Sequence, residues 1–355
     1  MHLLGDTGVS SVMRSPRGSA TLSPMFGFSH RWLTLALALA CNAQAAEPLH
    51  GAGATFPGPV YDAWAEAYAR ATGTPVRYDA VGSGLGIELA MKGQVDFGAS
   101  DVPLPADRLA AAGLRQFPAV IGAVVPVVNI AGIAPGRLVL DAPVLSAIYR
   151  GRITAWSDPA IAALNPGLAL PATRITVVHR ADASGSTWLW SHWLGESDAA
   201  WRDGPGTGAT LAWPMGTAGL GNEGVASLVQ RTRSSIGYVA YAYAREHHLG
   251  DVRLPSHDGP VVRAERSTFE AAVAAAHWNG AADLAGGLTN APGARSWPIV
   301  GASYVLVRPG GAGAARVEAF FTWALGSGSG VVSDLGYVPL PPEAAGQVLA
   351  SLRHE

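Results

Sequence analysis

The sequence predicts an α/β fold of two domains, and three observations support this. The chain has 355 residues, more than one typical domain uses. Short apolar or β-branched runs alternate with segments whose apolar residues repeat at helical spacing, as in α/β proteins. Hydrophobic residues make up 49% of the chain and charged residues 14%, so the chain can bury a large core. The low charge, with a formal net charge of −2, argues against nucleic acid as a partner.

Residues 1–46 have the pattern of a secretory signal that is removed on export. The apolar run WLTLALALAC, residues 32–41, follows Arg31 and is too short to span a bilayer. Small residues (AQA) come soon after it, and Met25 is the more natural start. Cys41 is the single cysteine, so no disulfide framework is available, and a lipid anchor at this residue is the alternative to cleavage.

The mature chain begins with a glycine-rich turn that opens a helix. GAGATFP covers residues 51–57, and Val60, Trp64 and Tyr68 follow at helical spacing before Gly73. A proline at the first position of a helix loses no hydrogen bond, which fits the proline that ends this turn. The pattern predicts a turn and a helix closed by the glycine.

A second glycine-rich turn follows a short predicted strand. The run 76–81 predicts a strand that leads into GSGLG, residues 82–86, and a helical stretch ending near Gly93. The next run, 95–99, predicts a strand that delivers Asp101 to its carboxyl end.

A third turn of the same kind lies further along the chain. RITVVH, residues 174–179, predicts a strand that enters RADASGST, residues 180–187, ahead of a helix predicted over 188–194. Between the second and third turns, residues 142–158 predict an amphipathic helix and a turn with no ligand role.

All three turns offer the chemistry of an anion site. The first N–H groups of a helix have no partner of their own, and the positive end of the helix dipole favours a negative ligand. Each turn alone is also consistent with a simple N-cap. Three turns in one chain, with Arg180 and Asp101 as charged companions, favour a shared anion site whose hydroxyl donors are Thr55, Ser83, Ser184 and Ser186.

Enzyme functions fit the motifs less well. A secreted phosphatase or hydrolase could use His179, Asp182 and Ser184, but ADASG does not match the nucleophile elbow G-x-S-x-G. The glycines of 82–86 match a dinucleotide-binding motif poorly, because the third comes one position early, and no P-loop lysine follows. H-x-x-H is absent, so we expect no metal and no cofactor.

Five segments resemble the periplasmic phosphate-binding proteins of bacterial phosphate ABC transporters, the PstS family. They occur in the family's order and span essentially the whole mature chain: GAGATFP (51–57), VDFGASD (95–101), NPG (165–167), RADASGS (180–186) and QRTRSSIGYVAYAYA (230–244). The resemblance implies a type II periplasmic-binding-protein fold, in which two α/β lobes enclose a cleft and the chain crosses twice between them. Lobe 1 would contain residues 47–125 and 300–355, and lobe 2 residues 126–299.

The resemblance also implies a ligand and its partners. Phosphate would be held by Thr55, Phe56, Ser83, Asp101, Arg180, Ser184, Gly185 and Ser186, with Asp182 orienting Arg180. A monomer in the periplasm would pass phosphate to an inner-membrane ABC permease and its ATPase.

The expected carboxylate, Asp101, explains how such a site selects its anion. Arg180 would hold Asp101 ionised, so that the carboxylate accepts the O–H that phosphate keeps and sulfate lacks at neutral pH. A site built for a substrate O–H rejects an analogue without it by about 10⁴–10⁵. Arsenate, which also carries a proton, remains an alternative ligand.

Some positions depart from the family pattern. Ser186 stands where threonine is common, which keeps the hydroxyl but loses a methyl group that would restrict the rotamer. Leu220 stands where lysine is frequent, so a peripheral charge near the cleft is missing. His179 replaces a basic residue, and we expect it to point away from the site.

Overall fold

The computed structural model describes residues 47–276 and 288–353. The predicted secretory signal, with Met25 and Cys41, lies outside these residues. The described residues belong to one compact unit that starts at Ala46. None of their helices combines the length and apolar character that crossing a membrane requires.

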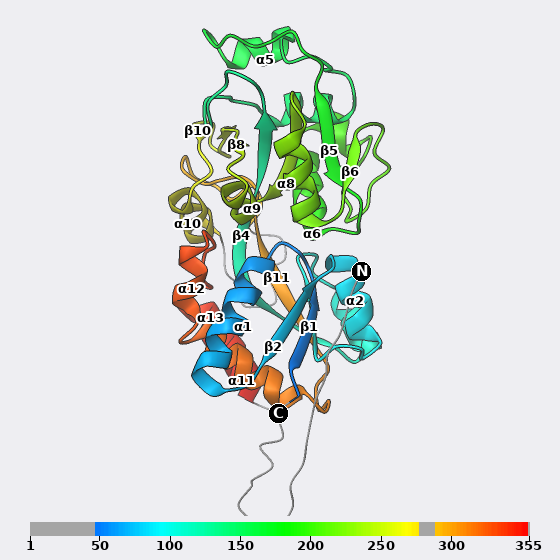
Figure 1. Ribbon diagram of the computed structural model, residues 1–355, viewed down its shortest axis with the longest axis vertical. Coiled ribbons are helices and arrows are strands. Elements are labelled where there is room, and N and C mark those ends of the chain that lie inside the picture. Colours follow the sequence, from blue (N-terminus) through cyan, green and yellow to red (C-terminus); the bar gives the residue numbers. More distant parts are fainter. Residues whose placement is uncertain (1–46, 277–287, 354–355) are drawn as a thin grey trace, which may run out of the picture. The chain divides into compact units, whose positions relative to one another are not determined.

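The centre of this unit is a mixed sheet (Figure 1). Its strands within the described ranges are β1 (Leu49–Gly53), β2 (Val76–Ala80), β3 (Phe97–Ser100), β4 (Arg115–Asn129), β5 (Thr176–Arg180), β6 (Thr217–Gly219), β7 (Ser235–Ala240), β8 (Gly250–Asp251) and β11 (Val300–Val307). Their order is β2-β1-β3-β11-β4-β7-β5-β6, and β8 pairs with β4. A separate antiparallel pair consists of β9 (Leu254–Pro255) and β10 (Val261–Val262).

Strand β4 links two halves of this sheet. Its residues up to Ala123 pair with β11, and its residues from Val124 pair with β7. The amide of Val124 also donates to the carbonyl of Ile299, at 2.9 Å, just before β11 begins. We call the part with β1, β2, β3 and β11 the first half and the part with β5 to β8 the second half. The predicted lobe ranges, 47–125 with 300–355 and 126–299, remain a proposal that this change of partners supports.

Helices pack on both halves of the sheet. Those nearest the first half are α1 (Gly58–Thr72), α2 (Ser83–Met91), α3 (Ala106–Ala112), α11 (Ala314–Leu325), α12 (Ser329–Asp334) and α13 (Pro342–Arg353). Those nearest the second half are α4 (Ala142–Tyr149), α5 (Pro159–Leu164), α6 (Gly185–Ser197), α7 (Ala199–Arg202), α8 (Gly221–Arg231) and α9 (Tyr241–Glu246). Helix α10 (Arg266–Ala275) contacts β11. This is the mixed α/β architecture that the alternating pattern predicted.

The local reasons for these elements are visible in α1. Val60, Trp64 and Tyr68 are buried on one face, as their spacing predicted. The helix ends at Gly73, which has a positive φ of 76° and whose amide donates to the carbonyl of Ala69. Aromatic rings then join this helix to the sheet, since Tyr61 contacts the rings of both Tyr78 and Phe97. The first turn is therefore anchored on a rigid core.

The helix that follows the third glycine-rich turn begins earlier than predicted. The sequence pattern placed it over residues 188–194, whereas α6 covers Gly185–Ser197. Ser184 is its N-cap, and the Oγ of Ser184 accepts a hydrogen bond from the amide of Thr187 at 3.1 Å. The glycine-serine pair that looked like part of the turn is thus the first turn of the helix.

Candidate functional site

The predicted anion turns lie at the carboxyl ends of parallel strands. Strand β1 pairs in parallel with β2 and β3, so the residues that follow these strands share one edge of the first half. Thr55, Ser83 and Asp101 lie there. In the second half, β5 pairs in parallel with β6, and Arg180 ends β5. Ligand sites of open α/β sheets are usually at such edges.

The second and third turns touch one another across the two halves. The Oγ of Ser83 accepts hydrogen bonds from the amide of Gly185, at 3.1 Å, and from the amide of Asp101, at 3.3 Å. The amide of Gly84 donates to the carbonyl of Ala183 at 3.0 Å. The structure therefore brings together residues that are about a hundred positions apart in the chain.

The first turn reaches the second half through Asn222. The Nδ2 of this buried residue donates to the hydroxyl oxygens of Thr55, at 2.8 Å, and Ser186, at 3.3 Å. Its Oδ1 accepts from the amide of Ala240 at 2.8 Å. The sequence reasoning missed Asn222. The signal was present, because the loop GTAGLGNEG is a fourth glycine-rich turn and Asn222 is the second residue of α8.

Arg180, which is buried, and Asp182, which is half-buried, form an ion pair with two hydrogen bonds. The Nε of Arg180 donates to Oδ1 of Asp182 at 2.8 Å, and its Nη2 donates to Oδ2 at 2.5 Å. Burial by itself would raise the pKa of Asp182, but Arg180 and the amide of Gly221, at 3.1 Å from Oδ1, hold this pKa below its usual range. Asp182 is therefore ionised at neutral pH and fixes the plane of the guanidinium group.

Asp101 differs from the sequence-based expectation. Arg180 was predicted to hold it ionised, but the guanidinium fork is bonded to Asp182 instead. Burial raises the pKa of Asp101 to about 7, and the nearby Ser303 hydroxyl, Arg180 charge and Ser83 hydroxyl only partly oppose this. The Oδ1 of Asp101 is buried without a hydrogen-bond partner among the described residues. Its Oδ1 atom is thus still available to form a hydrogen bond with a ligand.

Asp101 does not act as a helix cap, which was its structural alternative. The next helix, α3, begins five positions later, and its N-cap is Pro105. Backbone of the second half lies against the carboxyl group instead, since a Cβ added to Gly185 would be 2.4 Å from both Cβ and Oδ2 of Asp101. Only a glycine allows this approach.

Several donors of the predicted ligand set are uncommitted. The amide groups of Phe56 and Ser186 and the Nη1 of Arg180 make no hydrogen bond to another described residue. Ser186 is the second residue of α6, where an amide has no intrahelical partner. All side chains of the predicted set are at most 6% exposed. A predicted set that combines uncommitted donors with one buried carboxyl group suits a small oxyanion that itself carries a proton.

The geometry does not support a hydrolase. A nucleophilic serine needs a histidine base within hydrogen-bond reach. The Nδ1 of His179 instead lies 3.1 Å from the carbonyl of Arg180, and its ring stacks on Trp213, away from the site as predicted. The Oγ of Ser184 caps α6. In the described part of the chain, no group of three His, Cys, Asp or Glu side chains could hold a metal ion.

The departure at Leu220 lies on the surface. This side chain is 72% exposed, and it comes immediately before Gly221, whose amide bonds to Asp182. The residue missing there is therefore a surface charge close to the site and not one of its buried donors.

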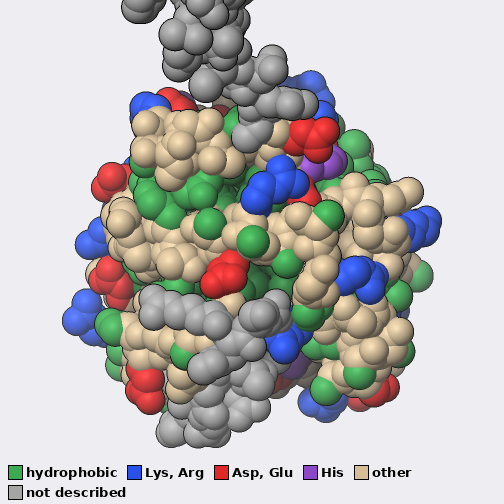
Figure 2. Space-filling view, turned by 90° about the horizontal axis from the view of Figure 1, so that it is seen from below, with side chains coloured by type: hydrophobic (Ala, Val, Ile, Leu, Met, Phe, Trp, Pro, Cys, Tyr) green, Lys and Arg blue, Asp and Glu red, His purple; other side chains and the backbone are tan. Residues whose placement is uncertain are grey.

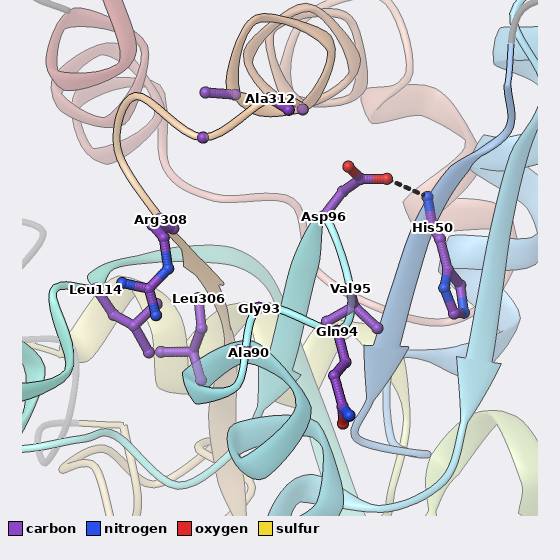
Figure 3. Close-up of a pocket in the computed structure, with 13 residues that line it drawn as sticks. His50, Ala90, Gly93, Gln94, Val95, Asp96, Leu114, Leu306, Arg308 and Ala312 are labelled. Atoms are coloured by element: carbon purple, nitrogen blue, oxygen red, sulfur yellow. Dashed lines mark hydrogen bonds between the residues drawn. The ribbon is translucent and has the colours of Figure 1, made fainter.

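A separate cavity of about 320 Å³ lies at the amino ends of β1 and β3 (Figure 3). Its charged groups already have partners: Asp96 accepts from the amide of His50 at 2.8 Å, and Arg308 donates to the carbonyls of Ala112 and Met91. This cavity is at the opposite end of the strands from the anion turns and does not compete with them.

Seen from below, acidic and basic side chains are interspersed on the visible face of the molecule (Figure 2).

Comparison with known proteins agrees with this geometry. The model of the PBP superfamily domain matches residues 40–327. The chain is 42% identical over 313 residues to the phosphate-binding protein PstS of Pasteurella multocida (strain Pm70), covering 87% of this chain and 91% of that protein. It is 43% identical over 305 residues to the phosphate-binding protein PstS of Xylella fastidiosa (strain 9a5c), covering 85% and 84%.

A solved structure supports the fold independently. The phosphate-binding protein from Stenotrophomonas maltophilia superposes with a TM-score of 0.67 at 21% identity, covering 86% of this chain and 94% of that one. This likeness agrees with the type II periplasmic-binding-protein fold expected from the sequence. With the two relatives above, it leads to one conclusion: the chain belongs to the PstS family of phosphate-binding proteins.

Proposed function

We propose that this chain captures inorganic phosphate between the two halves of its sheet and delivers it to an ABC transporter for import. The observation that carries this proposal is the setting of Asp101, a buried carboxyl group with an unpartnered Oδ1 that lies near the Ser83 and Ser303 hydroxyls of the first half and near Gly185 and Arg180 of the second half. Membership of the PstS family supports it and leaves no role for the hydrolase alternative.

The proposed ligand set combines charge, hydroxyl groups and backbone amides. Arg180 supplies the counter-charge, with its fork held by Asp182 and its Nη1 left for the ligand. The remaining proposed contacts are Thr55, Phe56, Ser83, Asp101, Ser184, Gly185 and Ser186. Roughly eight charge-assisted hydrogen bonds of about 1.5–3 kcal/mol each, less the costs of desolvation and ordering, would give micromolar or tighter binding.

Phosphate reaches this site only if the halves separate. The proposed side chains are buried. Two hydrogen bonds join the halves: Gly185 bonds to Ser83, and Asn222 bonds to Thr55. We infer that the halves open about the crossings near Val124 and Ile299 and close again on phosphate. Phosphate oxygens then replace some of these protein–protein hydrogen bonds.

The carboxyl group of Asp101 determines which anions are accepted. Phosphate can donate an O–H to it, whereas sulfate would place an oxygen without hydrogen beside another acceptor. Arsenate has the same hydrogen-bonding groups as phosphate and is the second candidate ligand.

The cellular setting follows from the predicted secretory signal. We propose that the mature chain works as a monomer in the periplasm, where it docks on the permease of an inner-membrane ABC transporter powered by its ATPase. A lipid anchor at Cys41 is the alternative to a free periplasmic chain.

Calorimetric titration of the purified chain, after analysis for co-purifying phosphate, tests this function. Phosphate should bind at micromolar concentration or below, and excess sulfate should not compete. Arg180→Ala should weaken binding by at least about 100-fold, because phosphate and Asp182 both lose their counter-charge. Arg263→Ala is the matched control, since Arg263 pairs with Asp251 through the same two-bond geometry outside the site. Native affinity in Arg180→Ala would exclude Arg180 as a ligand.

A further inference from the structure

Three tyrosine hydroxyl groups converge on the first anion turn. The three consecutive carbonyls of residues 54–56 each accept a hydrogen bond from a different tyrosine. Tyr78 donates to the carbonyl of Ala54 at 2.7 Å, Tyr243 to that of Thr55 at 2.8 Å, and Tyr337 to that of Phe56 at 2.5 Å. Tyr78 lies in β2, Tyr243 lies in α9, and Tyr337 follows α12. Elements that are far apart in the sequence thus hold one short turn.

These bonds determine which way the amide groups of the turn point. In a planar trans peptide, the carbonyl of one residue and the N–H of the next point in opposite directions. Tyr78 therefore orients the amide of Thr55, and Tyr243 orients the amide of Phe56. Residue 57 is proline and has no N–H, so Tyr337 fixes the entry into α1.

The orientation matters because of the sign of the peptide dipole. With the carbonyls held on the tyrosine side, the partly positive N–H ends remain for an anion. If the peptide between Thr55 and Phe56 turned over, it would present a partly negative oxygen to the ligand. The turn would then repel the anion that its amide is expected to bind.

The three hydroxyls are suited to act as fixed donors. Each tyrosine is at most 9% exposed, and burial raises the pKa of all three, so the hydroxyls keep their protons. The ring of Tyr337 also meets that of Phe56 edge-on, at 5.9 Å between centroids. Tyr61, in the same aromatic core, has no hydrogen-bond partner for its hydroxyl among the described residues. A hydroxyl group that points at the first anion turn is therefore not a general property of the buried tyrosines.

We propose that Tyr78, Tyr243 and Tyr337 are positioning residues that hold the first turn with its amides toward the bound anion. The proposal rests on the proposed function. Tyr243 belongs to the second half of the sheet and the turn belongs to the first, so its bond is made only when the halves are in contact. Closure thereby completes the orientation of the Phe56 amide.

Tyrosine-to-phenylalanine variants test the proposal by removing single hydroxyls. Tyr243→Phe should weaken phosphate binding about 10-fold in calorimetry, with Tyr78→Phe as a second variant if the first does not fold. Tyr149→Phe and Tyr61→Phe are matched controls and should bind as the unmodified chain does. The hydroxyl of Tyr149 also faces a backbone carbonyl, that of Val178 at 3.5 Å, but in the second half.

A second readout separates positioning from a general loss of stability. Nuclear magnetic resonance of ¹⁵N-labelled chain should show a smaller change of the Phe56 amide shift on phosphate binding in Tyr243→Phe than in the unmodified chain. Tyr78→Phe, which loses a bond within the first half, should show a changed Thr55 amide shift before any phosphate is added. Unchanged affinity and an unchanged Phe56 amide would overturn the proposal, as would equal losses in the two controls. If the unmodified chain does not bind phosphate, the proposed function fails, and the Thr55 amide shift in Tyr78→Phe still decides whether a tyrosine orients the turn.

Discussion

Asp101 is a carboxylic acid that the fold places where burial makes its ionised form unfavourable. Backbone at Gly185 and the hydroxyl of Ser83 surround it, and its Oδ1 has no partner among the described residues. An unpaired carboxylate in such a place avoids its charge by holding a proton. Phosphate, by donating an O–H, would stabilise the ionised form. Binding and ionisation of this side chain are therefore linked.

The stability of the ligand-free protein should depend on pH through Asp101. Unfolded chain releases this proton near the ordinary value of 3.8, whereas the folded protein keeps it up to about pH 7. A pKa that is higher in the folded state means that stability falls as pH rises between these two values, by at most about 4 kcal/mol. Urea denaturation across this range measures the fall. Asp101→Asn should abolish it, and the same slope in that variant would exclude Asp101 as the cause.

Asp101→Asn should also relax the rejection of sulfate. An amide can donate a hydrogen bond to a fully deprotonated oxyanion, which a carboxylate cannot. Sulfate should then compete with labelled phosphate in the variant at concentrations that have no effect on the unmodified chain. Continued exclusion of sulfate to the same degree would show that selectivity has another origin.

One residue at the start of helix α6 is expected to contribute both to the stability of the fold and to phosphate binding. Ser184 caps it, and the same residue is a proposed phosphate ligand. Ser184→Ala should cost about 1 kcal/mol of unfolding free energy and also weaken phosphate binding. Asp141→Ala is the matched control, because Asp141 caps α4 through Val144 at 2.9 Å. It should lose similar stability in thermal denaturation and bind phosphate normally. Equal affinities for the two variants would assign Ser184 to capping alone.

Most elements could be predicted because glycine marks the turns and apolar spacing marks what lies between them. The strands predicted at 76–81, 95–99 and 174–179 occur at Val76–Ala80, Phe97–Ser100 and Thr176–Arg180. The contacts between elements were harder. Asn222 bonds to residues far away in the sequence, and the raised pKa of Asp101 depends on packing by the other half. Local pattern carries no information on such long-range neighbours.

The approach of the two halves depends on a missing side chain. A Cβ at position 185 would lie 2.4 Å from Cβ of Asp101, although alanine suits a helix well. Gly185→Ala should therefore fold and yet keep the halves apart, with phosphate affinity at least 10-fold lower. Small-angle scattering in saturating phosphate should give a larger radius of gyration than for the unmodified chain. Gly330→Ala, with nothing within 4 Å of the added methyl group, is the control. A closed, tightly binding Gly185→Ala protein would contradict this account.

Strand β4 also has a consequence for how the protein loses its structure. It is one uninterrupted strand, Arg115–Asn129, that pairs with β11 in the first half and with β7 in the second. Neither half can melt without withdrawing a central strand from the other. We therefore expect the two halves to unfold in one cooperative transition, as a smaller single domain does, although they are proposed to rotate about the crossings. The proposed movement of the halves would thus not allow either half to denature alone.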